Sequence, residues 1–444
     1  MLSETADAGL RLDQAPPLSL PLSFFLTAPC FMVAAGLLLL WAGPSMVLSR
    51  YLLGTIAFTH LGTLGVLAMV MFGALYQMTP VVAASPVPAL WLARVVHAAL
   101  LLGAATLAGG VVTQTRPVLF VAFGALGVAW LGFVLPVGLA LWRSAAAADA
   151  TVRGMRIALG CLLWLGVLGL WMAHGHAGLR FPGPRPLWMG VHLALGLLGW
   201  IGALITAVSF QVLPMFYLTP PLAAVHKRWL LHAVVGSAVL ASAVLCASAL
   251  LRPELAQHLA LWASYAFVPA ALAVWGFAPL LTLRAIAARK RKRSDASLRF
   301  WIAGLGCAPL LLLLGGANLV FSDPRLELGF GWLALFGWAL FIVHGMLYRI
   351  VPFLVWFHRL SHLVGYVPVP SVAKLLPERW PRIAFALHAA LVLSGACAIA
   401  LRSGALARLT GLLLVLLAAQ LLRSLAHLTR YRAPVVLAGD AVRP

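Results

Sequence analysis

The chain has 444 residues, of which 63% are hydrophobic and only 9% are charged, and its mean hydropathy is +1.02. A water-soluble core cannot bury this much apolar side-chain surface, so the composition excludes a soluble globular protein and indicates a lipid bilayer as the solvent. The formal net charge is +21. With no soluble domain to present basic residues to nucleic acid, we expect this charge to reflect membrane topology and attraction to anionic lipid headgroups.

Twelve apolar stretches follow one another with short polar breaks, and each is long enough to cross about 30 Å of hydrocarbon as a helix. This pattern is typical of helical rather than barrel membrane proteins. The sequence therefore predicts an all-α polytopic membrane protein. The expected spans are 21–42, 51–79, 92–113, 118–142, 156–173, 187–217, 229–251, 256–282, 300–320, 329–357, 383–402 and 406–427.

One motif occurs in the second, sixth and tenth stretches, and it ends in an aromatic residue, a polar residue, two spacers and a proline. Its copies are LGVLAMVMFGALYQMTP (64–80), LGWIGALITAVSFQVLP (198–214) and FGWALFIVHGMLYRIVP (336–352). They align without a gap, so three glycines, three aromatic residues and three prolines coincide. Recurrence at one long period indicates an internal repeat.

A second motif, a His-Ala pair, stands early in the apolar stretch that follows each copy, at His97, His232 and His388. Two linked motifs that recur in the same order favour triplication of a four-helix unit. We therefore expect pseudo-symmetric repeats and two cytoplasmic tails within a single transmembrane domain. The repeats are placed at 21–142, 156–282 and 300–427, and the tails at 1–20 and 428–444.

Basic residues are concentrated in alternate loops, and Lys and Arg in short loops are retained on the cytoplasmic side. This alternation predicts that both termini are cytoplasmic, in a membrane of the bacterial inner-membrane type. The first apolar stretch begins some twenty residues into the chain, which is not typical of a cleavable signal peptide. The basic residues are Arg143, Arg153, Arg156, Lys227, Arg228, the run 289–293, Lys374, Arg379, Arg382, Arg430 and Arg432.

All ten acidic residues fall in predicted tails or loops, so no carboxylate is left in the membrane to drive a proton-coupled transport cycle. The five cysteines lie singly inside predicted helices, where we expect them to pack rather than to form disulfides or bind metal. The segment 358–382 contains prolines that exclude a long helix. The cysteines are Cys30, Cys161, Cys246, Cys307 and Cys397.

Polar residues at corresponding places form a triplet of pairs inside the membrane: Gln77, Gln211 and Arg349 precede His97, His232 and His388 in the three repeats. An amide and an imidazole can hydrogen-bond between helices without placing a charge in lipid. We therefore expect structural hydrogen bonds within these pairs, at least for Gln77 and Gln211.

The remaining histidines are candidates for cofactor chemistry, because neutral imidazole ligates haem iron, copper and zinc. His60 and His192 begin the second and sixth stretches on the outer side, and His174 and His176 close the fifth stretch beside them. His344 lies deeper in the tenth stretch, where it is either a ligand or a satisfied interior histidine. The candidate cofactor ligands are thus His60, His192 and His344, and the candidate metal ligands are His174, His176 and His192.

Twelve helices, cytoplasmic termini, a threefold four-helix repeat and histidines on the second, sixth and tenth helices resemble subunit I of the haem-copper oxidase superfamily, including its nitric-oxide-reducing and nitric-oxide-response relatives. The resemblance covers nearly the whole chain as architecture. It implies that His60 ligates a haem, since the family's second-helix histidine does so. It also implies that His192 stands on the helix of a copper ligand, but Gly196 occupies the place of the tyrosine found four residues later in many members.

Two further ligand groups of that family are missing here. Its paired histidines at the outer end of the seventh helix have no counterpart, since His232 is near the inner end. Its tenth-helix His-x-His is also missing, since Gly345 and Met346 follow His344. The resemblance therefore implies a haem protein, with haem b and possible copper, that lacks a complete binuclear centre. Oxygen reduction and proton pumping are not expected.

Depth along the helices separates the candidate ligands. His60 and His192 lie about 20 and 22 residues before Pro80 and Pro214, whereas His344 lies about eight residues before its proline, some 18 Å lower at about 1.5 Å per residue. We therefore expect His60 to act with His192 or another outer histidine. The sequence keeps three functions open: electron transfer, nitric-oxide chemistry or sensing through haem; a non-redox channel or transporter for a metal ion or small neutral molecule; and an accessory subunit docked on a respiratory-chain or redox protein.

Overall fold

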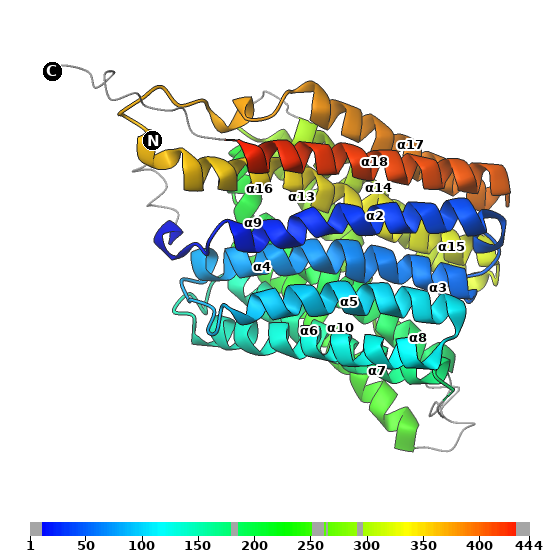
Figure 1. Cartoon of the computed structure of the whole chain (residues 1–444). Helices are drawn as coiled ribbons and strands as arrows, with labels where there is room; N and C mark the ends of the chain where they lie inside the picture. The colour runs from blue at the N-terminus through cyan, green and yellow to red at the C-terminus, as the bar shows by residue number, and fades with distance from the viewer. Residues whose placement is uncertain (1–10, 179–184, 251–261, 263–264, 291–295, 432–444) are drawn as a thin grey trace.

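The computed structural model describes residues 11–178, 185–250, 262, 265–290 and 296–431 (Figure 1). All regular structure in these residues is helical, and twelve helices are long and apolar enough to span a membrane. The predicted fold class and the number of spans are therefore confirmed. The predicted tails fall mostly outside the described residues, as do residues 291–293 of the basic run.

Each span is a single helix, in some cases divided by a π-helical segment that is labelled η. The bounds are α2 (Ser19–Met46); α3 (Leu53–His60), η2 (Leu61–Ala68) and α4 (Met69–Val82); α5 (Leu92–Thr113); α6 (Arg116–Arg143); α7 (Ala150–His176); α8 (Arg185–Ala194), η3 (Leu195–Gly202) and α9 (Ala203–Tyr217); α10 (Ala224–Leu250); α12 (Val268–Ala271), η4 (Leu272–Phe277) and α13 (Ala278–Ala287); α14 (Ala296–Val320); α15 (Pro324–Trp332), η5 (Leu333–Ala339) and α16 (Leu340–Arg359); α17 (Arg379–Ala400); and α18 (Gly404–Arg430).

The eighth span departs most from its prediction. It was expected at 256–282, but the described helix runs from Val268 to Ala287. Pro269 stands in its first turn, where a proline's missing N–H costs nothing because those amides have no helical acceptor. Residues 256–261 and 263–264 of the expected span lie outside the described residues. The segment 358–382 contains no long helix, as predicted: between the end of α16 at Arg359 and the start of α17 at Arg379 there are only short 3₁₀ turns, η6 (Ser361–Leu363) and η7 (Val372–Lys374).

The second, sixth and tenth spans form the interior of the bundle. In the most apolar window of the second and sixth spans 72% of the residues are buried, and in the tenth 61%, against 28% in the fourth and fifth. The segments η2 and η3 both contact η5. The three copies of the sequence motif therefore lie on the three central helices, which are the three most buried of the described spans.

The π-helical segments of these three helices begin at equivalent positions. Leu61, Leu195 and Leu333 each stand four residues before the aligned glycines Gly65, Gly199 and Gly337. A π-helical stretch is rare and frequently marks a functional site. An internal repeat predicts that the three π-helical segments begin at the same place in each copy, as they do here. The superposition of the three whole repeats stays a prediction.

The aligned glycines allow each central helix to touch the helix before it. A Cβ at Gly199 would stand 2.8 Å from Cys161 Sγ of α7, and one at Gly65 would stand 2.3 Å from the Phe31 ring of α2. Both distances are too short for a side chain, so the close approach requires glycine. Cys161 is buried and reduced at this contact, which fits the packing role expected for the cysteines.

The first and last spans are neighbours in the bundle, because α2 packs along α18 (Figure 1). The start of α2 and the end of α18 lie at the same end of the bundle in this view. An even number of spans requires this arrangement. The assignment of that end to the cytoplasm stays a prediction from the basic loops.

Candidate functional site

His60 closes α3 and directly precedes the π-helical segment of the second span. Its Nδ1 lies 2.8 Å from the carbonyl oxygen of Ile56 one turn earlier. A neutral imidazole that donates its Nδ1–H to a carbonyl must carry its lone pair on Nε2, and this bond also fixes the direction of the ring. His60 therefore presents an oriented, unprotonated Nε2.

His192 occupies the corresponding part of the sixth span, in α8. Its ring lies against the backbone of Gly169 in α7, because a Cβ there would stand 3.0 Å from His192 Cε1. The Nδ1 of His192 is buried and has no hydrogen-bond partner. A buried imidazole nitrogen without a partner costs about 1–3 kcal/mol, so this ring is suited to receive a ligand.

His60 and His192 stand on the second and sixth spans, near enough that the charged forms of the two rings would repel each other. The expectation that the two outer histidines share a depth stays a prediction. Both side chains keep part of their surface exposed although they stand on two of the most buried spans.

Several glycines stand in the outer halves of the central spans. A Cβ at Gly190, Gly329 or Gly331 would meet no atom within 4 Å, and one at Gly62 would meet only Phe336, at 3.8 Å. These positions lie in the outer halves of the three central spans. At these points the three central spans carry no side chain.

Aromatic rings fill the contact between the outer halves of the second and tenth spans. Trp332 and Phe336 stack with ring centroids 4.3 Å apart, and the Phe58 ring lies 5.4 Å from Phe336. Trp332 also donates its indole N–H to the carbonyl of Val392 in α17. The family's pairing of ligands from the second and tenth helices would require this stack to be displaced.

Ion pairs lie at the outer ends of the second and tenth spans. Arg50, just before α3, lies 3.1 Å from the carboxylate of Glu327 in α15. Asp323 caps α15 by accepting the N–H of Arg325 at 2.8 Å. The hydrogen bond from the Arg325 side chain is the main cause that lowers the pKa of Asp323. These contacts fix the start of the tenth span relative to the second.

His344 is placed differently from the outer histidines. Its Nδ1 lies 3.1 Å from His388 Nδ1, and His388 Nε2 lies 2.9 Å from the carbonyl oxygen of Phe336. The carbonyl can only accept, so His388 carries its proton on Nε2 and accepts at Nδ1 the proton of His344. The two side chains are 1% and 0% exposed. His344 is therefore a satisfied interior histidine at Nδ1, with a buried Nε2 that has no partner.

This histidine dyad leaves no room for a haem at His344. The Phe300 ring lies 4.8 Å from the His344 ring, and the Phe341 ring stacks on His388 at 3.8 Å. A large planar group cannot approach a nitrogen enclosed in this way. Sequence reasoning placed both histidines but paired neither with the other, because they stand at unrelated offsets on neighbouring helices.

The expected bonds within the polar triplet do not form, and this prediction was wrong. His97 Nε2 bonds to Thr27 Oγ1 of α2 at 2.8 Å, whereas Gln77 Oε1 is buried without a partner. His232 is exposed on the lipid-facing side of α10 and makes no hydrogen bond to Gln211. Helix packing therefore gives these histidines neighbours other than Gln77 and Gln211, the partners expected from the sequence.

Arg349 stands in the third repeat where Gln77 and Gln211 stand in the first two, and its side chain also faces away from His388. Its guanidinium donates to the carbonyl oxygen of Phe216 at 2.9 Å and lies over the rings of Phe216 and Tyr217. It thereby joins the inner ends of the tenth and sixth spans. A desolvated guanidinium gains from both contacts, because it has several donors and is attracted to aromatic faces.

The predicted metal cluster at the outer end is not formed. Across the described residues no group of three or more His, Cys, Asp or Glu side chains gathers in a way that could hold a metal ion. His174 donates Nδ1–H to the Leu170 carbonyl at 2.7 Å and stacks on Phe123 of α6, so it faces the fourth span. His174, His176 and His192 therefore do not form one site.

Comparison with known proteins adds no identification. No family model matches the chain, and no curated protein matches its sequence. His60 on the second span is oriented through its Nδ1, and His192 on the sixth span has a buried Nδ1 without a hydrogen-bond partner.

Proposed function

We propose that this chain is a haem-binding integral membrane protein of the haem-copper oxidase subunit I type that lacks a complete binuclear centre. Its role is electron transfer or nitric-oxide-related chemistry or sensing. The observation that supports the proposal is a pair of histidines on two central helices, each ahead of a π-helical segment: the His60 ring is fixed through Nδ1, and His192 has a buried Nδ1 without a partner.

In this proposal His60 would bind the haem iron through Nε2, while the Ile56 carbonyl holds the ring in orientation by accepting the proton of Nδ1. His192 would offer a second nitrogen from the sixth span. A haem held by these residues would supply one-electron transfer or, with only one of the two histidines bound, an iron that can take nitric oxide. The buried aromatic residues around the outer halves of the helices exclude water from the site.

Spectroscopy and metal analysis of purified protein test the proposal. Protein from haem- and copper-replete cells should show a haem b spectrum, and His60→Ala or His192→Ala should abolish or strongly reduce it. His174→Ala is the matched control, because His174 has the same bond to the carbonyl one turn earlier but faces another helix. His344→Ala should keep the chromophore, since its ring is enclosed by aromatic residues.

Three results would overturn the proposal. One is wild-type protein that contains neither haem nor copper. Another is a chromophore that survives both His60→Ala and His192→Ala, with gel filtration showing folded protein. The third is a chromophore lost only in His344→Ala, which would restore the family's second- and tenth-helix pairing. In the first case the channel and accessory-subunit hypotheses would replace the haem hypothesis.

A further inference from the structure

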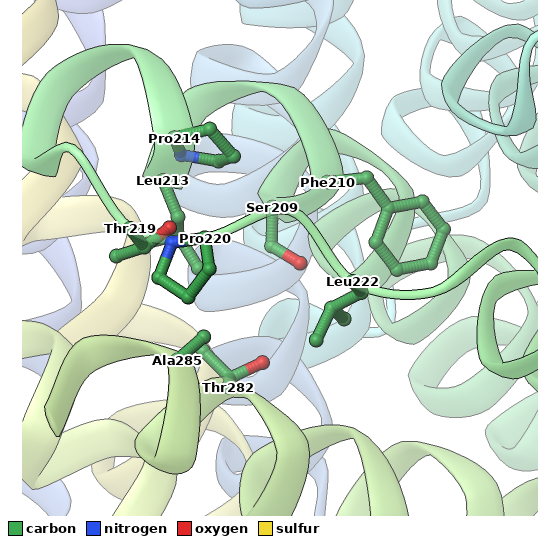
Figure 2. A pocket seen from close by; sticks show the side chains of 9 residues that line it. All are labelled: Ser209, Phe210, Leu213, Pro214, Thr219, Pro220, Leu222, Thr282 and Ala285. Carbon is green, nitrogen blue, oxygen red and sulfur yellow. The ribbon is translucent and has the colours of Figure 1, made fainter. Parts of the chain in front are cut away.

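A small cavity opens between the sixth and eighth spans, at the end of the bundle that the basic loops assign to the cytoplasm. Its wall comes from α9, from the loop that follows it and from α13 (Figure 2). The cavity volume is about 10 Å³. This is enough for a single oxygen-sized atom. The lining residues are Ser209, Phe210, Leu213, Pro214, Thr219, Pro220, Leu222, Thr282 and Ala285.

The cavity is lined with hydroxyl groups that are out of contact with solvent. Ser209, Thr219 and Thr282 are 6%, 6% and 4% exposed. The Thr219 hydroxyl has no hydrogen-bond partner, although Thr219 lines the cavity. Buried hydroxyls are normally paired, so an unpartnered one beside an oxygen-sized space indicates a ligand atom there.

Two lysines flank this cavity. The Lys227 ammonium lies 5.4 Å from the centroid of the Phe210 ring, which forms part of the wall. The backbone N–H of Lys290 donates to the carbonyl of Leu218, directly before Thr219. That bond ties the chain after α13 to the loop after α9, so the Lys290 backbone lies next to the loop that carries Thr219.

No described carboxylate neutralises these lysines. The ion pairs of the described residues involve Asp13, Glu327, Asp323 and Glu378, which bond to arginines elsewhere. Asp149 instead caps α7. Asp295 lies outside the described residues. The described part of the site thus carries two positive charges beside donor groups, which is complementary to an anion.

Apolar side chains continue from the site along the lipid-facing surface. Val225 and Trp229 of α10 are 59% and 53% exposed, and Phe277 is 47% exposed. The Trp229 and Phe277 rings meet edge to face at 5.3 Å. Exposed apolar surface below a basic site suits acyl chains below a headgroup, and a tryptophan is typical of the headgroup level.

We propose that this cavity and its two lysines bind the phosphate of a phospholipid with a net negative headgroup, from the leaflet at that end of the bundle. One phosphate oxygen enters the cavity and accepts from the Thr219 hydroxyl. The remaining phosphate oxygens face Lys227 and Lys290, and the acyl chains lie along Trp229 and Phe277. A headgroup that carries its own ammonium is disfavoured by the two lysines.

Lipid titration followed by native mass spectrometry tests this site on the full-length protein. The probes are short-chain phosphatidylglycerol, short-chain phosphatidylcholine and inorganic phosphate. Phosphatidylglycerol should bind more tightly than phosphatidylcholine. The double variant Lys227→Gln with Lys290→Gln should weaken phosphatidylglycerol binding about 25-fold, at about fivefold for each lysine. Thr219→Val keeps the shape but removes the hydroxyl, and should weaken binding about tenfold.

The matched control removes two exposed basic residues from the same membrane side but away from the cavity, as Lys374→Gln with Arg430→Gln. It should leave binding within about twofold of wild type. An equal loss in this control would show general attraction to the basic surface and overturn the site. Displacement of the lipid by equimolar inorganic phosphate, or equal binding of both lipids, would also overturn it. These results do not depend on whether haem is bound.

Discussion

The histidine dyad gives the sharpest stability prediction. His388→Ala removes two buried hydrogen bonds, one to His344 and one to the Phe336 carbonyl, and the stack on Phe341. Interhelical hydrogen bonds in membranes contribute about 0.6 kcal/mol on average, with a maximum near 1.7. A cavity left by a large buried ring adds about 2–4 kcal/mol. We expect a total loss of about 3–5 kcal/mol in the free energy of unfolding.

The same substitution at the other two positions should cost much less. His97→Ala loses one bond to Thr27 at a partly buried site, so about 1 kcal/mol is expected. His232 is exposed and makes no hydrogen bond in the described structure, so its replacement should stay within about 0.5 kcal/mol. His388→Phe fills the volume without the bonds and should lie between the alanine variant and wild type.

Unfolding of detergent-solubilised protein, followed by heat or by SDS titration, measures the order of these variants. The reasoning requires His388→Ala to be far less stable than His97→Ala, and His232→Ala to resemble wild type. Equal losses at the three positions would refute it, because they would show the symmetric bonds that the repeat predicts and the structure lacks. A His388→Phe protein as unstable as His388→Ala would assign the cost to hydrogen bonding rather than to volume.

The remaining predictions concern topology and helix packing. In a cysteine-free background, Lys290→Cys should react with a membrane-impermeant thiol reagent only from the cytoplasm and Leu401→Cys only from outside; reaction of both from one side would contradict the twelve-span arrangement. Gly395→Ala places a Cβ 2.2 Å from the Trp332 ring and should cost about 1–3 kcal/mol in unfolding, whereas Gly316→Ala meets no atom within 4 Å and should be neutral or slightly stabilising. Similar stability of these two glycine variants would contradict the packing.

The fold class was predictable from the sequence because the bilayer imposes one requirement on every span. A segment that crosses hydrocarbon must satisfy its own backbone hydrogen bonds, so about 20 apolar residues predict a helix wherever they occur. The start expected for the eighth span lies outside the described residues, and Pro269 stands in the first turn of the helix that the structure describes.

The candidate site was predictable only in part. Counting residues back from Pro80 and Pro214 placed His60 and His192 at one depth, since rise per residue is nearly constant along a helix. The distance between the two histidines depends on how the second and sixth spans pack. The sequence of one helix does not predict that packing. The same limit explains the wrong pairing of Gln77 with His97: depth was predictable, but the direction each side chain faces was not.

The sequence by itself determined the solvent, the number of spans and the depth of each polar residue, because hydropathy and helix rise act locally along the chain. Tertiary structure alone decided which helices are central, where the π-helical segments lie and which histidines meet. His344 shows the difference most clearly. Its depth followed from the sequence, but its partner is His388 on another helix, and the surrounding rings that exclude a haem come from helices that only folding brings together.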